Sequence, residues 1–272
     1  MSLKHATAPR CWYARLQPPE SSAQVILSAA SHMTTRLAAL QNRHAGQRCV
    51  LVANGPSLNQ MDLSFLKHET VIGLNKIYLG FRKFHFYPRY YVAINRKVVD
   101  QGQDDIKALN CVKFIGNAAA VGNIQEDALT YLINTQSAQQ RFCKNIAIEG
   151  VHEGWTVTYA ALQVAYFLGF KQVVLIGMDH RYQYTGQPNE ARQLDGPDPN
   201  HFSASYFSGQ QWDNPDLAHS EESYRIARQV FEQDGRSIVD ATVNGACDVF
   251  GKVNYVEFFK IKKASREGFN QS

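Results

Sequence analysis

Several polar residues that could bind a small ligand stand directly after short apolar runs of the chain. Asparagines follow VLVA, VIGL, YVAI and FIG, and aspartates follow LIGM and SIV, at Asn54, Asn75, Asn95, Asn117, Asp179 and Asp240. A side-chain amide donates and accepts hydrogen bonds without adding charge, which suits contacts with a sugar, a base or a phosphate. Asparagine is also common in turns, and this is the simpler explanation for any one of these positions.

The stretch Gly55-Pro56-Ser57 directly after Asn54 forms a second candidate ligand contact. Pro56 fixes the turn, Gly55 permits close approach of the backbone, and Ser57 supplies a hydroxyl. The stretch matches neither the GK[ST] phosphate loop nor the GxGxxG dinucleotide motif. Its backbone amides could nevertheless hold a phosphate.

These residues would be positioned by strands that alternate with helices. Short apolar runs with little alternation are typical of strands covered on both faces. They span Cys49–Ala53, Thr70–Leu74, Tyr90–Ile94, Cys111–Ile115, Gln172–Ile176 and Ser237–Asp240. Helical patterns cover 21–46, 155–169 and 216–235, each with a glycine near its end. The alternation predicts an α/β protein with an open, mostly parallel, Rossmann-like sheet and helices on both faces.

Residues 180–215 have no periodic pattern and are rich in Gly, Pro, Asn, Asp and aromatic residues. A loop of this length in a compact domain is usually a lid or a binding loop. Its aromatic residues Tyr206, Phe207 and Trp212 could stack on a sugar or hold the lid in place, and we favour the second role. The expected organisation is an N-terminal extension and helix over 1–46, an α/β catalytic domain over 47–260, and a basic tail over 261–272.

Composition limits the classes of function. The chain has 272 residues, of which 44% are hydrophobic and 19% charged, with a formal net charge of +4. The net charge is mild, and the sequence has no dense basic stripe of the kind found in nucleic-acid binders, so no nucleic-acid partner is expected. The five cysteines include no CxxC pair, which argues against a disulfide framework or zinc site and suits a reducing cytoplasm. No stretch has the roughly 20 apolar residues that span a bilayer.

Three motifs in order carry a resemblance to known enzymes: VANGPSL, then GLNKIY, then YYVAINRKV. With EGWTVTYAALQVAYFLGFKQVVLIGMDHRY and NHF further on, roughly residues 48–255 resemble the small bacterial sialyltransferases of glycosyltransferase family 42, which use CMP-sialic acid. The same region is similar to the wider 6-hydroxymethylpterin diphosphokinase-like group, to which flagellin glycosyltransferases are related.

The sialyltransferase resemblance implies roles for particular residues. Asn54, Gly55 and Ser57 would contact the nucleotide and its phosphate, and Asn75 and Asn95 the donor. Thr156 would contact the CMP, whereas the neighbouring Trp155 departs from the family pattern. Tyr182 and Tyr184 would steady the leaving phosphate. His201 would be the general base, although a loop histidine is more often a solvated or packing residue.

The chemistry of these residues agrees with sugar transfer from a CMP-activated donor to a surface glycan. The departing phosphate gains negative charge, which hydroxyl and amide donors stabilise, and a histidine suits deprotonation of the acceptor hydroxyl. A single phosphate demands no metal, so no cofactor is expected. Asp179 could orient the backbone or bind Mg²⁺ in the rival reaction, pyrophosphate transfer from ATP to a pterin. A third alternative is a non-catalytic nucleotide-binding partner in polysaccharide assembly.

The expected partners are a nucleotide-sugar donor and a glycan acceptor. The expected location is the cytoplasm, and a peripheral contact with the inner membrane is compatible with the basic stretch KIKKASREG near the C-terminus. A solvated tail is the first explanation of that stretch. The resemblance also implies a homo-oligomer.

Overall fold

The described part of the chain is built around one open sheet of parallel strands. A computed structural model describes residues 35–137 and 140–261. Eight of the strands in this part form the sheet, in the order β12-β11-β8-β1-β2-β3-β4-β5, and every neighbouring pair is parallel. Their bounds are β1 Arg48–Val52, β2 Val71–Leu74, β3 Tyr90–Ala93, β4 Val112–Gly116, β5 Thr130–Ile133, β8 Gln172–Ile176, β11 Ser237–Asp240 and β12 Gly251–Lys252.

The chain order of the strands reverses beside β1. From β1 the chain adds β2, β3, β4 and β5 on one side, and then returns to place β8 against the other side of β1. The register Cys49–Val173 and Val52–Ile176 sets the ends of β1 and β8 side by side. In open α/β sheets the crevice beyond such a reversal is where ligands bind. The α/β architecture and open parallel sheet predicted from sequence are confirmed.

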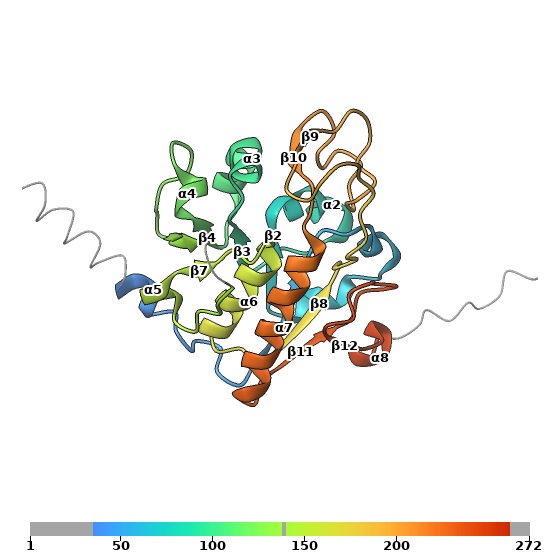
Figure 1. The fold of residues 1–272 in the computed structure, drawn as a ribbon. Helices are drawn as coiled ribbons and strands as arrows, with labels where there is room; N and C mark the ends of the chain where they lie inside the picture. Colours follow the sequence, from blue (N-terminus) through green and yellow to red (C-terminus); the bar gives the residue numbers. More distant parts are fainter. Residues whose placement is uncertain (1–34, 138–139, 262–272) are drawn as a thin grey trace, which may run out of the picture.

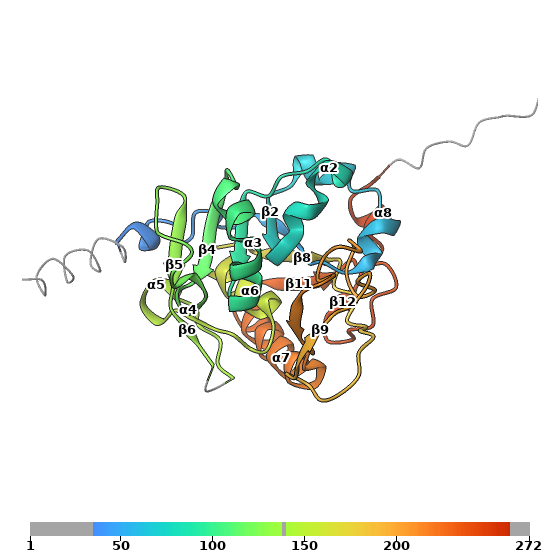
Figure 2. The ribbon, with the colours of Figure 1, turned by 90° about the horizontal axis from the view of Figure 1, so that it is seen from above.

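Helices cover both faces of the sheet (Figures 1 and 2). The helical elements are η1 Pro56–Gln60, η2 Ser64–His68, η3 Asn75–Gly80, α2 Phe81–Phe84, α3 Arg96–Ala108, α4 Asn117–Ala120, α5 Ile146–Glu149, α6 Val157–Phe167, α7 Leu217–Gln233 and α8 Tyr255–Phe258. Helices α6 and α7 pack on one face with Cys49 and Leu51, and η1, η2 and α3 pack on the other with Val50 and Val52. Because both faces are covered, the central strands β1, β2, β3 and β8 are apolar over most of their length.

The sequence pattern found the central strands and helices α6 and α7, but it missed helix α3 and several short elements. Helices α6 and α7 lie within the predicted ranges 155–169 and 216–235. Strand β5 and the small parallel pair β6 Thr135–Gln136 and β7 Val151–His152 come from a stretch with no clear pattern. Residues 35–38 are helical and turns continue to Gly46. The rest of the predicted N-terminal helix and most of the basic tail lie outside the described residues.

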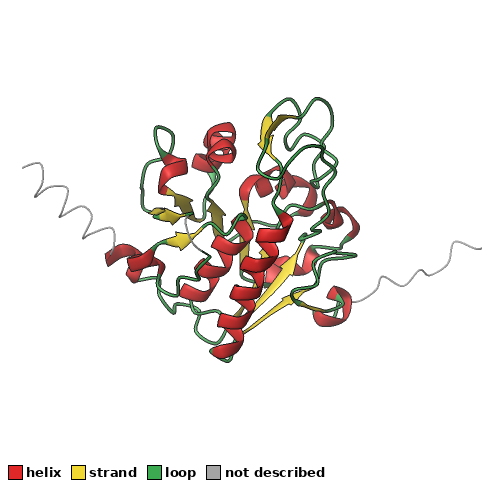
Figure 3. Cartoon of the chain, viewed as in Figure 1, coloured by secondary structure: helices red, strands yellow, loops and turns green. Residues whose placement is uncertain are grey.

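The predicted lid is a long loop with one small antiparallel pair, β9 Ala191–Gln193 and β10 Gln211–Asp213 (Figure 3). Its aromatic residues pack into the core on the α3 face: Phe202, Tyr206, Phe207 and Trp212 are all buried. They therefore hold the lid in place, as favoured from the sequence. Over the described residues, no helix combines the length and apolar character needed to cross a bilayer.

Candidate active site at the reversal of strand order

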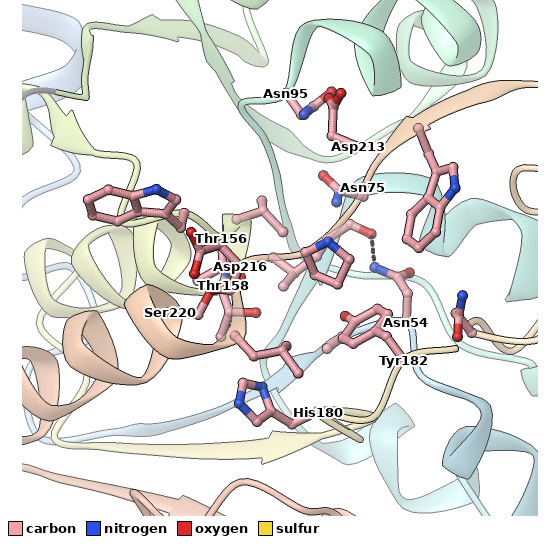
Figure 4. A pocket seen from close by; sticks show the side chains of 18 of the residues that line it. Asn54, Asn75, Asn95, Thr156, Thr158, His180, Tyr182, Asp213, Asp216 and Ser220 are labelled. Atoms are coloured by element: carbon pink, nitrogen blue, oxygen red, sulfur yellow. Dashed lines mark hydrogen bonds between the residues drawn. The ribbon is translucent and has the colours of Figure 1, made fainter. Parts of the chain in front are cut away.

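A cavity of about 720 Å³ opens at the carboxyl ends of β1, β2, β3 and β8, beneath the lid. Asn54, Asn75 and Asn95, from the ends of three neighbouring strands, all line it (Figure 4). Asn117 and Asp240, which end strands further out, are not part of its lining. The structure thus brings together the predicted amides nearest the reversal.

The three asparagine side chains are held in different ways. The Asn54 amide nitrogen donates to the carbonyl of Leu74 at 3.1 Å, and its Oδ1 is buried without a hydrogen-bond partner among the described residues. Oδ1 of Asn75 is likewise buried and unpartnered, and the residue has a left-handed φ of 47°. Oδ1 of Asn95 caps α3 by accepting from the amide of Val98 at 3.2 Å. Two of the three therefore retain an unused acceptor.

The Gly55-Pro56-Ser57 turn is held by Asp179. Ser57 donates to the two carboxylate oxygens of Asp179, from its amide at 2.9 Å and from its hydroxyl at 2.6 Å. Gly55 and Asp179 line the cavity, whereas Pro56 and Ser57 lie outside its lining. Burial raises the pKa of Asp179 above its ordinary value, and the bonds from Ser57 offset part of that rise. This geometry supports loop orientation, the first of the two roles considered for Asp179.

His201 lines the cavity and is oriented by a carboxylate that the sequence analysis did not single out. Its Nδ1 lies 2.8 Å from Oδ2 of Asp198, which is almost fully buried, while its Nε2 has no hydrogen-bond partner among the described residues. The imidazole stacks on Tyr206 at 3.9 Å between ring centroids. Burial alone would raise the pKa of Asp198, but hydrogen bonds from His201 and backbone amides lower it below its ordinary value. Asp198 is therefore a carboxylate at neutral pH.

The lid brings His201 to the tip of β1. The amide of Phe202, the next residue, donates to the carbonyl of Asn54 at 2.9 Å. Tyr182 lines the cavity beside this contact, with its ring centroid 6.3 Å from that of His201. Tyr184 packs against the core and is not part of the lining. The backbone of Gln183 between them is held on both its amide and carbonyl by the Asn200 side chain.

The start of α6 forms another wall of the cavity. Thr156 caps this helix, and its hydroxyl accepts from the amide of Thr158 at 3.3 Å. The same hydroxyl lies 3.3 Å from the hydroxyl of Tyr224 on α7. Both threonines line the cavity, so the residue carried over from the sialyltransferase pattern is in a position to contact a ligand.

A second histidine paired with a carboxylate lines the same cavity. Nε2 of His180 lies 3.2 Å from Oε1 of Glu221 on α7, and its backbone is left-handed with φ 55°. Burial lowers the pKa of His180 below its ordinary value, although the bond with Glu221 acts in the opposite direction. Left-handed backbone in a non-glycine residue stores strain, which is concentrated at functional sites.

Comparison with known proteins places the chain in a family. A model of the family described as "6-hydroxymethylpterin diphosphokinase MptE-like" matches residues 25–185, more than half of the chain. The chain belongs to the MptE-like family. The matched region includes the strand ends at Asn54, Asn75, Asn95 and Asp179 but stops before His201. No curated protein matches the sequence.

A solved structure shares the fold of this MptE-like chain. It is a MAf glycosyltransferase from Magnetospirillum magneticum AMB-1, with a TM-score of 0.51 and 11% sequence identity. The likeness covers 87% of this chain and 39% of that one, so the chain spans less than half the length of the solved protein. At this identity the likeness is one of fold.

The charges around the cavity of the MptE-like chain are unequal. Lys97 forms an ion pair with Asp213, and Arg181 lines the cavity without an ion-pair partner among the described residues. Carboxylates also line it at Glu153, Asp179 and Asp216. Within the described ranges, no group of three His, Cys, Asp or Glu side chains is arranged to hold a metal ion.

Sequence reasoning missed the partners of the site residues. Asp198 stands three positions before His201 in DPNH, a spacing that could have suggested the pair. Glu221 is 41 positions from His180, and only the packing of α7 against the site brings them together. Arg181 belongs to no sequence motif that would have marked it as a site residue.

Proposed function

We propose that this protein is a glycosyltransferase that moves a sialic acid-like or other sugar from a CMP-activated donor to a hydroxyl of a glycan acceptor. The observation that carries the proposal is the His201–Asp198 pair, held against the tip of β1 in the cavity at the reversal of strand order. The shared fold with a glycosyltransferase and the MptE-like family both support a transferase.

In this proposal His201 acts as the general base. Nε2 accepts the proton of the acceptor hydroxyl as that oxygen bonds to the anomeric carbon of the donor. Asp198 accepts a hydrogen bond from Nδ1–H, fixes the ring orientation and stabilises the positive charge that develops on the imidazole. The bond between the anomeric carbon and the phosphate oxygen breaks, and CMP leaves with the bonding electrons.

Tyr182 and Arg181 would stabilise the departing phosphate. Burial, together with the charges of Asp179 and Asp198, raises the pKa of Tyr182 to about 12, so its hydroxyl stays protonated and can donate. The Arg181 guanidinium adds positive charge where negative charge develops. Tyr184 was expected to share this role, which would require it to reach the cavity from its place against the core.

The direct test is release of CMP from CMP-sugars in the presence of glycan acceptors. We expect turnover with at least one CMP-sugar, a loss of roughly 10²–10⁴-fold in His201→Ala, and a loss of at least about tenfold in Asp198→Asn. His68→Ala, an exposed histidine outside the cavity, serves as the matched control and should keep full activity. CMP binding without turnover across the donor panel would point instead to a non-catalytic partner.

A second candidate, pyrophosphate transfer from ATP to a pterin, is favoured by the family description and by the excess of carboxylates around the cavity. That reaction would need Mg²⁺, with Asp179 as a ligand. Both oxygens of Asp179 accept hydrogen bonds from Ser57, which makes it a poor first ligand. Formation of AMP from ATP and 6-hydroxymethylpterin, abolished by EDTA, would establish this activity. A CMP-sugar reaction that survives EDTA would establish the favoured one.

A further inference from the structure

Trp155 is a large aromatic residue at the rim of the cavity and is 40% exposed. It follows Gly154, and both have left-handed backbone, with φ of 55° and 59°. A bulky residue in this conformation is an outlier that the surrounding structure must maintain. The turn thus keeps an indole ring at the mouth of the cavity, where glycine or asparagine would be less strained.

The indole ring is supported from one side. It stacks on His219, with 4.7 Å between ring centroids and 20° between the planes. Nδ1 of His219 lies 2.8 Å from Oδ2 of Asp216, the residue that caps α7, and Asn189 of the lid donates to the same oxygen at 3.0 Å. Because His219 covers one face, only the opposite face of the indole remains for a ligand.

The groups around Trp155 suit a ring with many hydroxyls. Glu153, two residues earlier, lines the cavity, and its carboxylate has no ion-pair or hydrogen-bond partner among the described residues. Thr156, Asp216 and Ser220 gather at this end of the cavity, apart from Asn54 and Tyr182 (Figure 4). An apolar face beside carboxylate and hydroxyl acceptors matches the alternating apolar and hydroxyl-bearing surfaces of a sugar ring.

We infer that Trp155 and Glu153 form the acceptor subsite, in which a neutral sugar ring stacks on the indole while its hydroxyls donate to the Glu153 carboxylate. The inference rests on the proposed function, since it assigns the acceptor of that reaction. The unpaired charge of Glu153 disfavours an acceptor that is itself acidic. A neutral terminal sugar is therefore bound in preference to a sialylated one.

Binding can be tested without any donor, by saturation-transfer NMR titration of lactose and 3′-sialyllactose. We expect lactose to bind more tightly than sialyllactose, and its Kd to rise at least tenfold in Trp155→Ala and only a few-fold in Trp155→Phe. Glu153→Gln should reduce the difference between the Kd values of lactose and 3′-sialyllactose. Tyr87→Ala is the control, because Tyr87 is 75% exposed and outside the cavity lining. Unchanged lactose binding in Trp155→Ala, or no lactose binding by the unmodified protein, overturns the subsite.

Kinetics separate this inference from the proposed function. Trp155→Ala should raise the acceptor KM at least tenfold, whereas Tyr87→Ala should leave both the acceptor KM and CMP release to water unchanged. If Trp155→Ala still transfers the sugar with an unchanged acceptor KM, the subsite is wrong and the proposed function stands. If the protein turns over no CMP-sugar but binds lactose through Trp155, the proposed function is wrong and the sugar subsite stands. Loss of donor hydrolysis in Trp155→Ala would place the indole in the donor site and also overturn the inference.

Discussion

The carboxylate of Asp179 links the two strands at the centre of the sheet. It lies at the end of β8 and holds the turn that follows β1, where Gly55 donates from its amide to the carbonyl of Gly177 at 2.8 Å. The turn is so close to β8 that a Cβ atom on Gly55 would lie 1.8 Å from Oδ2 of Asp179. A glycine is needed here for lack of space, since its φ of −69° is open to any residue.

Gly55→Ala should therefore destabilise the protein by about 1–3 kcal/mol, because the added methyl forces Asp179 or the turn to shift. Gly251→Ala is the matched control: no atom lies within 4 Å of its Cβ position. Urea denaturation of both variants measures the difference in the free energy of unfolding. Equal stability of Gly55→Ala and the unmodified protein would show that the turn is not held as described.

For the site residues, the sequence could predict which side chains gather at the sheet edge but not their partners. Asn54, Asn75 and Asn95 were predictable because parallel strands end at the same edge, so a residue's position in the chain fixes its place in space. The spacing of Asp198 and His201 is local, but the place of this pair at the tip of β1 depends on how the lid packs. The pairing of Glu221 with His180 depends on how α7 packs, which no local pattern encodes.

The lid is fixed by a buried lysine at the start of η3. Nζ of Lys76 donates to the carbonyl of Tyr206 at 2.8 Å and to the side chains of Gln101 and Gln210. Lys76 is only 3% exposed, and burial lowers its pKa to about 8, although the charge of Asp198 opposes this. One amine thus joins the lid to η3 and α3.

The pKa of Lys76 predicts a pH dependence of stability. An unfolded lysine keeps its ordinary pKa of 10.5, so between about pH 8 and 10.5 the unfolded chain binds more protons than the folded one. Raising the pH through this window therefore stabilises the folded state. Urea denaturation at pH 7.5 and 10 measures this effect. Between these pH values the free energy of unfolding of the unmodified protein should rise by up to about 3 kcal/mol relative to that of Lys76→Met. The comparison with Lys171→Met, at an exposed lysine, should show no such rise. If the difference in free energy of unfolding between the unmodified protein and Lys76→Met is the same at both pH values, the burial of this amine is contradicted.

The left-handed turn before α6 also leads to a prediction about stability. Trp155 has φ 59°, a conformation in which a Cβ atom costs about 1 kcal/mol that glycine avoids. Neither Trp155→Ala nor Trp155→Gly keeps the stack on His219, so the two variants differ mainly in this strain. Thermal and urea denaturation should find the glycine variant more stable by about 1 kcal/mol. An alanine variant of equal or greater stability would mean that the turn relaxes to another conformation.

The sequence predicted elements well where burial is uniform. The strands β1, β2, β3 and β8 are covered on both faces, so apart from Arg48 and Gln172 at the start of β1 and β8 they are apolar and recognisable. Strand β5 at the sheet edge has two partly exposed residues, Tyr131 and Leu132, and the pattern is weaker there. The pair β9–β10 consists of three-residue strands whose positions are set by the packing of the lid.

The strand order of the sheet decides where a ligand can bind. Because the strand order reverses beside β1, the loops after β1 and β8 meet at the carboxyl ends of the two central strands, and residues of both loops line the cavity. Neither half of the cavity wall is complete without the other: Asn54 comes from the first half of the chain and His201 from the second. A ligand in the cavity therefore bridges both halves and should stabilise the fold as a unit.

Thermal unfolding measures this stabilisation directly. A ligand that binds only the folded state at 100 times its Kd adds about 2.7 kcal/mol to the free energy of unfolding, which for a chain of this size raises Tm by roughly 5–10 °C. We expect CMP to give such a rise. Asn75→Gly removes the amide without straining the left-handed backbone and should reduce the rise, whereas Asn117→Ala, at a strand end outside the cavity, should keep it. An equal rise in Tm in both variants would place the nucleotide away from the carboxyl end of β2 and would contradict the proposed site.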